Sequence, residues 1–488
     1  MTYDVVVVGG GIGGLTIAAL LSARGVSTCL LERQSQVGGC IGRVEFSGYA
    51  FEPGIGLYVG FGRDETYSQI FSELKIAPPA ATSIESDYVV RMVDGSDVHL
   101  NRNDLQFYEN IRAAFPESAD AAVEFYETVK RVSELWKART ADEPTGGMLS
   151  KAFKKFRSKS KDDEFVLNAA TQTAVSFAGN TSKRFQQFIN AQLGAVLQST
   201  IDRCAFLPAC LALSLLRGKL YSIEGGTARL AERVEAAIKL AGGTVRLNSP
   251  VLRLAYNESG DAIGVDLLSG ERVIAKHAIV SNLTVWDTYG KLVGLNRTSA
   301  ATKARLANYT SSGSYIIYAT VEETTAQRLP APNFLVVGNE PALNDNLSSE
   351  FTVTIGPVAK DGKHPTTIKT TTEITQWFAF QTSEEDFSAR DQQTLEQFWE
   401  KLHNAVPELG SGIEVIETAN PRTFFDTTRR KLGMVMGIEP IPSNWPAKLD
   451  FTTEIPNLFI VGDTICPTFG ISEIARASQE LANLLTKT

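Results

Sequence analysis

The chain has 488 residues, more than the roughly 100–200 of a single domain, so we expect two consecutive or interleaved domains. Hydrophobic residues make up 43% of it and charged residues 21%, which is ordinary for a soluble globular protein and excludes a disordered or fibrous one. The formal net charge of −8 disfavours nucleic acid as a partner, because an acidic surface repels a phosphate backbone.

The chain opens with a pattern typical of a parallel α/β unit. Residues 4–8 (DVVVV) form a β-branched run of the kind buried on both faces of a parallel sheet, and a glycine cluster and an Ala- and Leu-rich helix follow. A second strand at 28–32 (TCLLE) closes a βαβ unit. Two alternating runs within 87–100, separated by Asp94 and Gly95, predict a hairpin that begins a different layer.

A largely helical block comes next. Residues 104–216 are helical in pattern, with a polar and basic interruption at 140–163, and predict an inserted helical subdomain. Its most apolar stretch, 204–216, is shorter than the ~20 residues needed to span a bilayer. The pattern leaves three alternatives for this stretch: a buried core helix, a monotopic membrane contact, or the mouth of a tunnel.

The rest of the chain alternates between strand and helix patterns. A helix between the paired glycines at 225–226 and 242–243 precedes four strands that lead up to residue 282. Residues 300–420 mix strand-like runs with a helix, which is typical of an α+β domain. A short strand at 457–461 and a helix at about 470–485 end the chain.

Cysteine and histidine usage argues against a disulfide framework and against a metal site. The five cysteines include no CxxC pair, which is typical of free thiols in a reducing compartment. No two of the four histidines lie at metal-ligand spacing, so we expect no metal. The chain also lacks a GxSxG nucleophile elbow. If the protein is an enzyme, its reactive group is expected to be a cofactor.

Gly9, Gly11 and Gly14 match GxGxxG at the turn between the first strand and the first helix. The first glycine permits a tight turn, the second lets the backbone approach a pyrophosphate, and the third permits close packing of helix on strand. Glu32 follows at the end of the second strand, where its carboxylate can accept hydrogen bonds from ribose hydroxyls and repel a 2′-phosphate. These residues predict a dinucleotide but leave NAD and FAD open.

Two further segments favour FAD. Gly38 and Gly39 extend the motif in the manner of flavoproteins, in which this loop passes close to the cofactor. LFIVGD, which ends in Gly462 and Asp463, resembles the second flavin fingerprint, whose aspartate hydrogen-bonds the ribityl and pyrophosphate part of FAD. The sequence therefore predicts FAD as the cofactor.

Five segments then carry a resemblance that runs from end to end of the chain. They are DVVVVGGGIGGLTIAALLSARG, ERQSQVGG, YSIEGGTARLAERVEAAIKLAGGTVRLNSPVLRL, AIVSN and NLFIVGDTICPTFGI. In order and spacing they resemble the phytoene desaturase and carotenoid isomerase family of flavoproteins, whose wider relatives are the flavin amine oxidases. Residues 48–61 (GYAFEPGIGLYVGF) are most similar to the corresponding segment of carotenoid isomerases.

The resemblance implies an α/β fold. A Rossmann-type FAD-binding domain with a parallel sheet would be built from residues 1–85, 217–298 and 420–488. An interleaved α+β substrate domain with a helical insertion would be built from residues 86–216 and 299–419. An apolar tunnel in the substrate domain would lead a long polyene to the isoalloxazine ring.

The resemblance also implies roles for individual residues. Val251 would meet the adenine through its backbone, and Gly54 would lie near the flavin ring. Gly470 and Ile471 would begin a helix aimed at the flavin N1/O2 region, where a helix N-terminus stabilises negative charge on reduced flavin. The expected cofactor-binding residues are Gly9, Gly11, Gly13, Gly14, Glu32, Arg33, Gly38, Gly39, Arg43, Gly54, Val251, Gly462, Asp463, Gly470 and Ile471.

The chain departs from the family pattern in two places. Many members carry arginine directly after the paired glycines, where this chain has Cys40; either Arg43, the next cation, replaces it, or the phosphate contact is lost. The glycine-rich loop before the last helix is Pro-Thr-Phe-Gly at 467–470, with bulkier residues where flavin and substrate should meet. With the flavin as the reactive group, Arg43 and Glu473 are the candidate catalytic residues near the ring.

The first functional hypothesis is an FAD-dependent oxidoreductase that desaturates a long apolar isoprenoid, a carotenoid-type polyene, by hydride transfer to the flavin. Three alternatives stay open: a flavin-dependent carotenoid cis–trans isomerase, an amine-oxidase-like flavoenzyme, and a non-catalytic prenyl-lipid carrier similar to the GDP-dissociation-inhibitor proteins. No second GxGxxG is present, so we expect no separate NADPH domain.

Membrane attachment is a separate question. Six cations and two phenylalanines fall within 151–161, a pattern typical of a solvated basic loop or of a segment that docks on an anionic membrane surface. A strand-like run begins by residue 4 and leaves no room for a leader. We therefore expect a cytoplasmic protein, either free or peripheral to a membrane.

Overall fold

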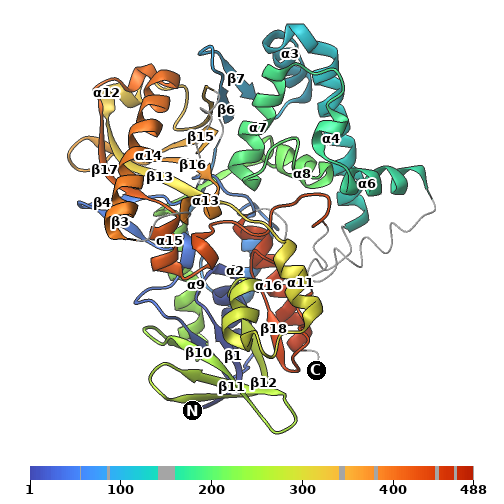
Figure 1. Ribbon diagram of the computed structural model, residues 1–488, viewed down its shortest axis with the longest axis vertical. Helices are drawn as coiled ribbons and strands as arrows, with labels where there is room; N and C mark the ends of the chain where they lie inside the picture. Colours follow the sequence, from blue (N-terminus) through green and yellow to red (C-terminus); the bar gives the residue numbers. More distant parts are fainter. Residues whose placement is uncertain are drawn as a thin grey trace.

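The computed structural model describes residues 1–54, 56–84, 88–140, 160–339, 347–378, 383–445, 450–465 and 470–486. These residues form two large sheets and a separate group of helices. The first sheet occupies the lower part of the molecule in Figure 1, and both chain ends lie on this part. The second sheet and the helical group stand above it, side by side.

The first sheet is built around β1 (Thr2–Val8), whose last four residues are buried valines. β1 pairs in parallel with β2 (Thr28–Leu31) on one side and with β12 (Arg272–Ser281) on the other. The parallel row continues to β9 (Thr244–Arg246) beyond β2 and to β18 (Leu458–Ile460) beyond β12. The predicted βαβ unit and its parallel sheet are confirmed.

An antiparallel pair extends this sheet. β10 (Val251–Tyr256) and β11 (Ala262–Leu267) form a hairpin, and β11 attaches to the first half of β12. β18 attaches to the second half of β12. The sheet thus takes strands from the beginning, the middle and the end of the chain.

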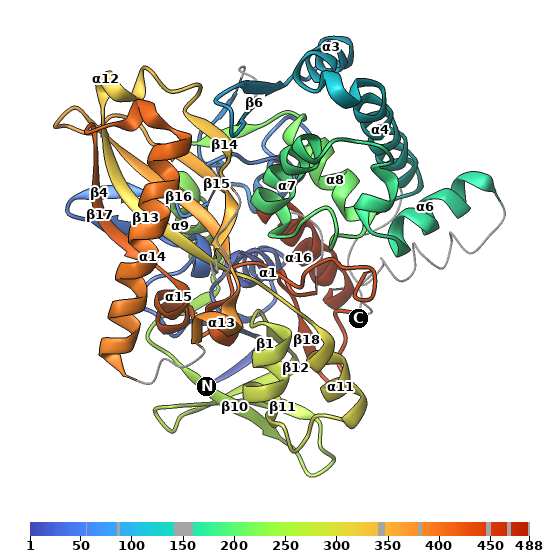
Figure 2. The same cartoon turned by 45° about the horizontal axis from the view of Figure 1, so that its top comes forward.

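The second sheet is antiparallel apart from one pair, in which β14 runs parallel to β6. The long helix α14 (Glu384–Ala405) covers one face (Figure 2), and its Phe398 and Leu402 are buried in the core beneath it. The strands, in spatial order, are β17 (Ile413–Ala419), β13 (Gly313–Glu322), β16 (Lys363–Thr372), β15 (Leu347–Ile355), β14 (Asn333–Val337), β6 (Tyr88–Arg91) and β7 (Asp97–Leu100).

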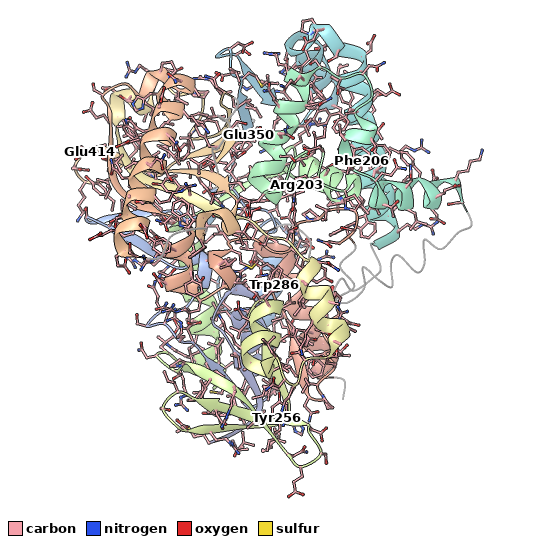
Figure 3. The ribbon with its side chains drawn as sticks, in the orientation of Figure 1. Arg203, Phe206, Tyr256, Trp286, Glu350 and Glu414 are labelled. Carbon is pink, nitrogen blue, oxygen red and sulfur yellow. The ribbon has the colours of Figure 1, made fainter. Side chains whose placement is uncertain are left out.

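The predicted helical insertion is confirmed. It comprises α3 (Asp104–Ala114), α4 (Ala119–Thr140), α6 (Lys161–Thr171), α7 (Lys183–Leu197) and α8 (Phe206–Leu216). Helix α8 is a core helix. Its Phe206, labelled in Figure 3, lies within the helical group and stacks on a neighbouring ring. The alternative of a membrane contact for 204–216 is therefore wrong.

None of the helices in the described parts of the chain is both long enough and apolar enough to cross a membrane. The basic segment 151–161 lies outside the described residues except for its last two positions. The expected membrane docking by this segment therefore stays a prediction.

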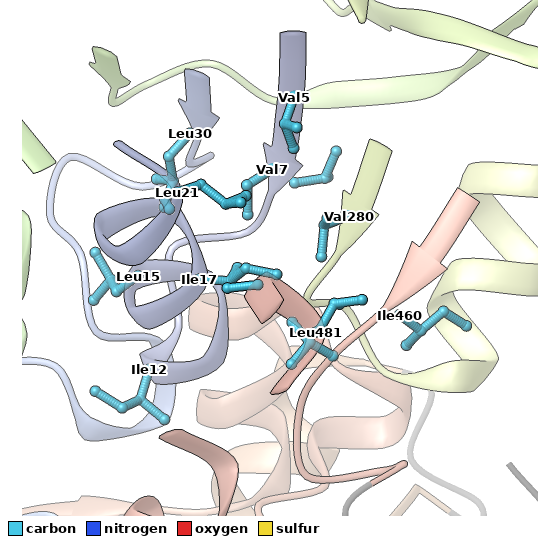
Figure 4. Packing of buried hydrophobic residues seen from close by; sticks show 14 of the residues in the cluster. Val5, Val7, Ile12, Leu15, Ile17, Leu21, Leu30, Val280, Ile460 and Leu481 are labelled. Atoms are coloured by element: carbon cyan, nitrogen blue, oxygen red, sulfur yellow. The ribbon is translucent and has the colours of Figure 1, made fainter. Parts of the chain in front are cut away.

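The core of the lower part joins three distant segments of the chain. Helix α1 (Ile12–Ala23) is buried along all but its last residue, as expected of a helix that is apolar on every side. It packs against α2 (Thr66–Leu74), α9 (Gly226–Leu240) and α16 (Ile471–Leu485). Figure 4 shows side chains of α1, β12, β18 and α16 around one apolar interior.

The fold is thus an α/β fold with a Rossmann-type domain and an interleaved α+β part that carries a helical insertion, as predicted. The exact domain boundaries stay a prediction. The remaining elements are β3 (Val44–Phe46), β4 (Tyr49–Phe51), β5 (Ala81–Ser83), β8 (Tyr221–Ile223), α10 (Val285–Asp287), α11 (Ala300–Asn308), α12 (Glu323–Ala326), α13 (Ile374–Phe378) and α15 (Pro421–Thr428), with short 3-10 or π turns between them.

Candidate functional site

A cleft of about 760 Å³ lies outside the carboxyl ends of the parallel strands. Its wall includes the residues that directly follow β1, β2 and β12, together with Gly462 and Asp463 shortly after β18. It also includes the start of α16 and the segment that follows α15. In parallel α/β sheets, this edge is where ligands bind. The position of the cleft therefore follows from the topology of the first sheet.

The glycine turn after β1 is too tight for side chains. Gly9 has φ +100°, and a Cβ on Gly14 would lie 2.1 Å from the Gly9 carbonyl oxygen, so this close packing requires glycine at position 14. Helix α1 begins at this turn with no side-chain cap and no acidic residue in its first turn. Its free N–H groups and positive dipole end suit a phosphate, so the residues present fit a dinucleotide.

Glu32 lies on the cleft wall with its carboxylate held by two backbone groups. Gly10 N–H donates to Oε2 and Gln34 N–H donates to Oε1, each at 2.7 Å. Each carboxylate oxygen can accept a further hydrogen bond, which ribose hydroxyls could donate. Val251 lines the same cleft. The geometry is that expected of a sugar-binding carboxylate.

The second glycine pair packs onto the first motif. Gly38 has φ +115° and donates its N–H to the Gly10 carbonyl at 2.8 Å, while a Cβ on Gly39 would contact the Gly11 backbone. Cys40, the next residue, lines the cleft. Burial raises the pKa of the Cys40 thiol, so the side chain stays neutral at physiological pH.

At the other end of the chain, Asp463 follows Gly462, and both lie on the cleft wall. Arg430 Nη2 donates to Asp463 Oδ2 at 2.7 Å. Burial disfavours the charge of Arg430, but the nearby carboxylate of Asp463 outweighs that effect and holds the pKa of the guanidinium above its ordinary value. The guanidinium of Arg430 therefore stays charged.

The last helix points its N-terminus into the cleft. Gly470 has φ +87°, α16 begins without a side-chain cap, and Gly470, Ile471 and Ile474 line the wall. Tyr67 donates its hydroxyl to the Ile471 carbonyl at 3.0 Å, which fixes the start of the helix. Residues 466–469, the bulky loop before it, lie outside the described residues.

The structure brings most of the predicted cofactor-binding residues to one cleft. Gly14 is not on the wall itself but packs beneath it, against Gly9. The predicted residues on the wall are Gly9, Gly11, Gly13, Glu32, Arg33, Gly38, Gly39, Val251, Gly462, Asp463, Gly470 and Ile471.

Three other predicted residues are not on this wall. Arg43 is turned outward: its side chain is 55% exposed and pairs with Glu45. Glu473 accepts hydrogen bonds from Arg476 within α16. Gly54 lies beside Tyr58, whose hydroxyl a Cβ on Gly54 would approach to 2.9 Å. The predicted placement of Arg43 and Glu473 near the reactive ring finds no support in these contacts.

Sequence reasoning missed two polar groups of the cleft. Asn282 follows β12, and its side chain lies over Gly11 and Gly13, where a Cβ would come within 2.7 Å of it. Its place directly after a buried strand was a signal for it. Arg430 has no such signal, because nothing in its local sequence indicates that it meets Asp463, which is distant in the sequence.

Comparisons with known proteins give the relatives of the chain. The family model of the flavin containing amine oxidoreductases matches residues 12–477. The chloroplastic prolycopene isomerase of Daucus carota is 25% identical over 499 residues, which cover 97% of this chain and 78% of the isomerase. The all-trans-retinol 13,14-reductase of Danio rerio is 23% identical, over 95% of this chain and 82% of the reductase.

Solved structures share the fold at lower identity. A putrescine oxidase bound to putrescine superposes with a TM-score of 0.68 at 16% identity, over all of both chains. Cyclohexylamine oxidase from Brevibacterium oxydans IH-35A gives a TM-score of 0.61 at 15% identity, over 99% of both chains. The family match spans nearly the whole chain, from the start of α1 to a point within α16. The chain belongs to the family of flavin containing amine oxidoreductases, and its cofactor is FAD.

Proposed function

We propose that this flavoprotein acts on the double bonds of a long apolar isoprenoid of the carotenoid type. The similarity that covers 97% of the chain carries this proposal, because that relative is named for prolycopene. A second relative of similar coverage is named for all-trans-retinol, a shorter conjugated isoprenoid. Both names point to a conjugated, mostly apolar substrate.

The cleft offers surfaces suited to such a substrate. FAD, when bound, supplies a ring that accepts or returns a hydride. Leu197, Met436 and Ile438 contribute an apolar stretch of the cleft wall that would exclude water. The uncapped N-terminus of α16 would stabilise negative charge beside it. The apolar tunnel implied by the resemblance stays a prediction.

Two reactions are compatible with this substrate class. The sequence favoured desaturation, in which the flavin takes a hydride from a saturated bond. The relative named as an isomerase favours cis–trans isomerisation instead. A prenyl-lipid carrier is disfavoured because a carrier needs no FAD, whereas the residues of the cleft fit this cofactor.

The test is incubation of the FAD-loaded protein with phytoene and with a poly-cis carotene, each with oxidised and with reduced flavin, followed by chromatography of the products. Desaturation gives a more conjugated product from phytoene with oxidised flavin. Isomerisation changes only the geometry of the poly-cis carotene. Putrescine, assayed in parallel, tests the amine-oxidase alternative. Absence of any change in both polyenes would overturn the proposal.

A further inference from the structure

The residue directly after the paired glycines contributes no cation to the cofactor cleft. Cys40 stands there and is neutral, and Arg43 turns outward to Glu45. A diphosphate carries two negative charges, and burying them without a cation is costly. The cleft wall must therefore take its positive charge from another element.

Arg430 is a partly buried cation on the cleft wall with one edge already fixed. Its side chain is 16% exposed, and Nη2 donates to Asp463 Oδ2 and to the Met436 carbonyl. Nε donates to the Met434 carbonyl at 3.0 Å. Within the described residues, no hydrogen bond uses Nη1. Two N–H groups of a preorganised guanidinium therefore remain available to a ligand.

The backbone around Arg430 is also held in place. The N–H of the next residue, Lys431, donates to Asp287 Oδ2, which is itself buried. Gly433 has φ +69°, and a Cβ there would overlap the Pro421 carbonyl oxygen. These contacts anchor the segment after α15 to α10 and to the start of α15, so that the guanidinium keeps its position without a ligand.

Contacts on the cleft wall place Arg430 close to the glycine turns. Arg430 donates to Asp463, which directly follows Gly462. A Cβ on Gly462 would lie 3.2 Å from Oδ1 of Asn282, the residue that lies over Gly11 and Gly13. Arg430 is thus linked through Asp463 and Asn282 to the turns from which α1 directs its free N–H groups into the cleft.

The other cations of the cleft are committed elsewhere. Arg33 donates to the carbonyls of Asp426 and Thr427. Lys291 is paired with Asp287 at 2.8 Å and donates to the Arg429 carbonyl. Arg429 itself is half-exposed. Of the cations on the described part of the wall, Arg430 combines burial with unused donors most fully.

We propose that Arg430 binds the diphosphate of FAD and supplies the positive charge that the loop after Gly39 lacks. A guanidinium donates charge-assisted hydrogen bonds to phosphate oxygens, and the two N–H groups on the free Nη1 edge can each donate to an oxygen of the diphosphate. The carboxylate of Asp463 orients the Nη1 edge through its Oδ2 atom, and its Oδ1 atom remains available to accept from the cofactor. The diphosphate then lies between the N-terminus of α1 and a cation from the opposite wall.

The experiment compares ligands that differ in the diphosphate. Apoprotein with Arg430→Gln is titrated calorimetrically with FAD, ADP and adenosine, beside the matched variant Arg43→Gln. We expect Arg430→Gln to weaken FAD and ADP by about ten- to a hundredfold and to leave adenosine unchanged, because only the first two carry the diphosphate. Arg43→Gln should bind all three as the parent protein does.

Two further variants guard against a folding defect. Arg430→Lys keeps a charge without the paired donors, so ADP should bind more weakly than to the parent but more tightly than to Arg430→Gln. Asp463→Asn removes the carboxylate that orients this edge, so ADP should bind more weakly and adenosine as it does to the parent protein. Equal losses for ADP and adenosine, unchanged ADP binding in Arg430→Gln, or a loss in Arg43→Gln instead, would each overturn the proposal.

Discussion

At Gly14 the fold leaves no room for a side chain, because the Gly9 carbonyl oxygen would lie 2.1 Å from a Cβ. We expect Gly14→Ala to push α1 away from β1, to lower the free energy of unfolding by about 1–3 kcal/mol and to reduce FAD binding. Chemical denaturation and flavin absorbance measure the two effects. Gly194→Ala in α7 is the control, since its Cβ would meet nothing within 4 Å. Equal losses in both variants would contradict the steric argument.

Glu32 is a second residue with a defined consequence. Its carboxylate accepts the N–H groups of Gly10 and Gln34, so its position is fixed before any ligand arrives. Glu32→Ala removes the expected acceptors of the ribose hydroxyls and should weaken FAD binding about ten- to a hundredfold. Fluorescence titration of apoprotein measures this. Glu45→Ala, on the exposed partner of Arg43, serves as control; unchanged affinity in Glu32→Ala would remove the carboxylate from the sugar site.

These residues also show why only part of the site could be predicted. Gly9 and Glu32 are predictable because one βαβ unit fixes their spacing and their place at the strand ends. Arg43 points away from the cleft because a carboxylate two residues away, Glu45, binds its guanidinium, and its predicted role stays a prediction. Arg430 was missed because its position depends on the fit of Gly433 against Pro421, a tertiary contact with no local pattern.

At the scale of elements, buried strands were predictable and their partners were not. The valine run of β1 and the hairpin β6–β7 follow from hydrophobic periodicity and turn residues. The parallel pairing of β6 with β14 joins segments more than 200 residues apart, and no local pattern indicates it. The helical insertion separates these strands in sequence while the second sheet brings them together.

Strand β16 carries a lysine whose burial should make stability depend on pH. Lys369 lies between Ile316 of β13 and Thr352 of β15, and burial lowers its pKa from 10.5 to about 8. Below pH 8 the charged side chain is present in both states, and its burial penalises the folded state fully. Between pH 8 and 10.5 the unfolded state binds more protons, so the free energy of unfolding rises with pH.

Lys369→Met removes this penalty. We expect the variant to be more stable than the parent at pH 7 by on the order of 1–3 kcal/mol, with the advantage shrinking as pH rises towards 10.5. Urea denaturation at a series of pH values measures it. Lys363→Met, at the start of the same strand and paired with Glu414, is the control. An advantage that did not change with pH would show that the cost is one of packing and not of charge.

At the scale of the whole molecule, Glu52 connects the part that holds the first sheet with the part that holds the second sheet. Glu52 accepts the N–H and hydroxyl of Thr227 at the start of α9 through its carboxylate. Its backbone carbonyl accepts the hydroxyl of Thr367 from β16 in the second sheet. Arg203 of the helical group likewise pairs with Glu439, beside the cleft residue Pro440. The parts are therefore tied to each other around the cofactor cleft.

The order of the strands along the chain strengthens the connection between the two sheets. The first sheet takes strands from both ends of the chain, and all strands of the second sheet lie between those ends in the sequence. We expect a single unfolding transition for the whole protein.

FAD at a hundredfold excess over its Kd should raise the free energy of unfolding by ~2.7 kcal/mol. Phe398→Ala, in the core beneath α14, should lower the same transition by about 3–5 kcal/mol, since it leaves a cavity. Scanning calorimetry with and without FAD measures both effects. Two transitions, of which only one responds to FAD, would show that the second sheet folds independently of the cofactor cleft.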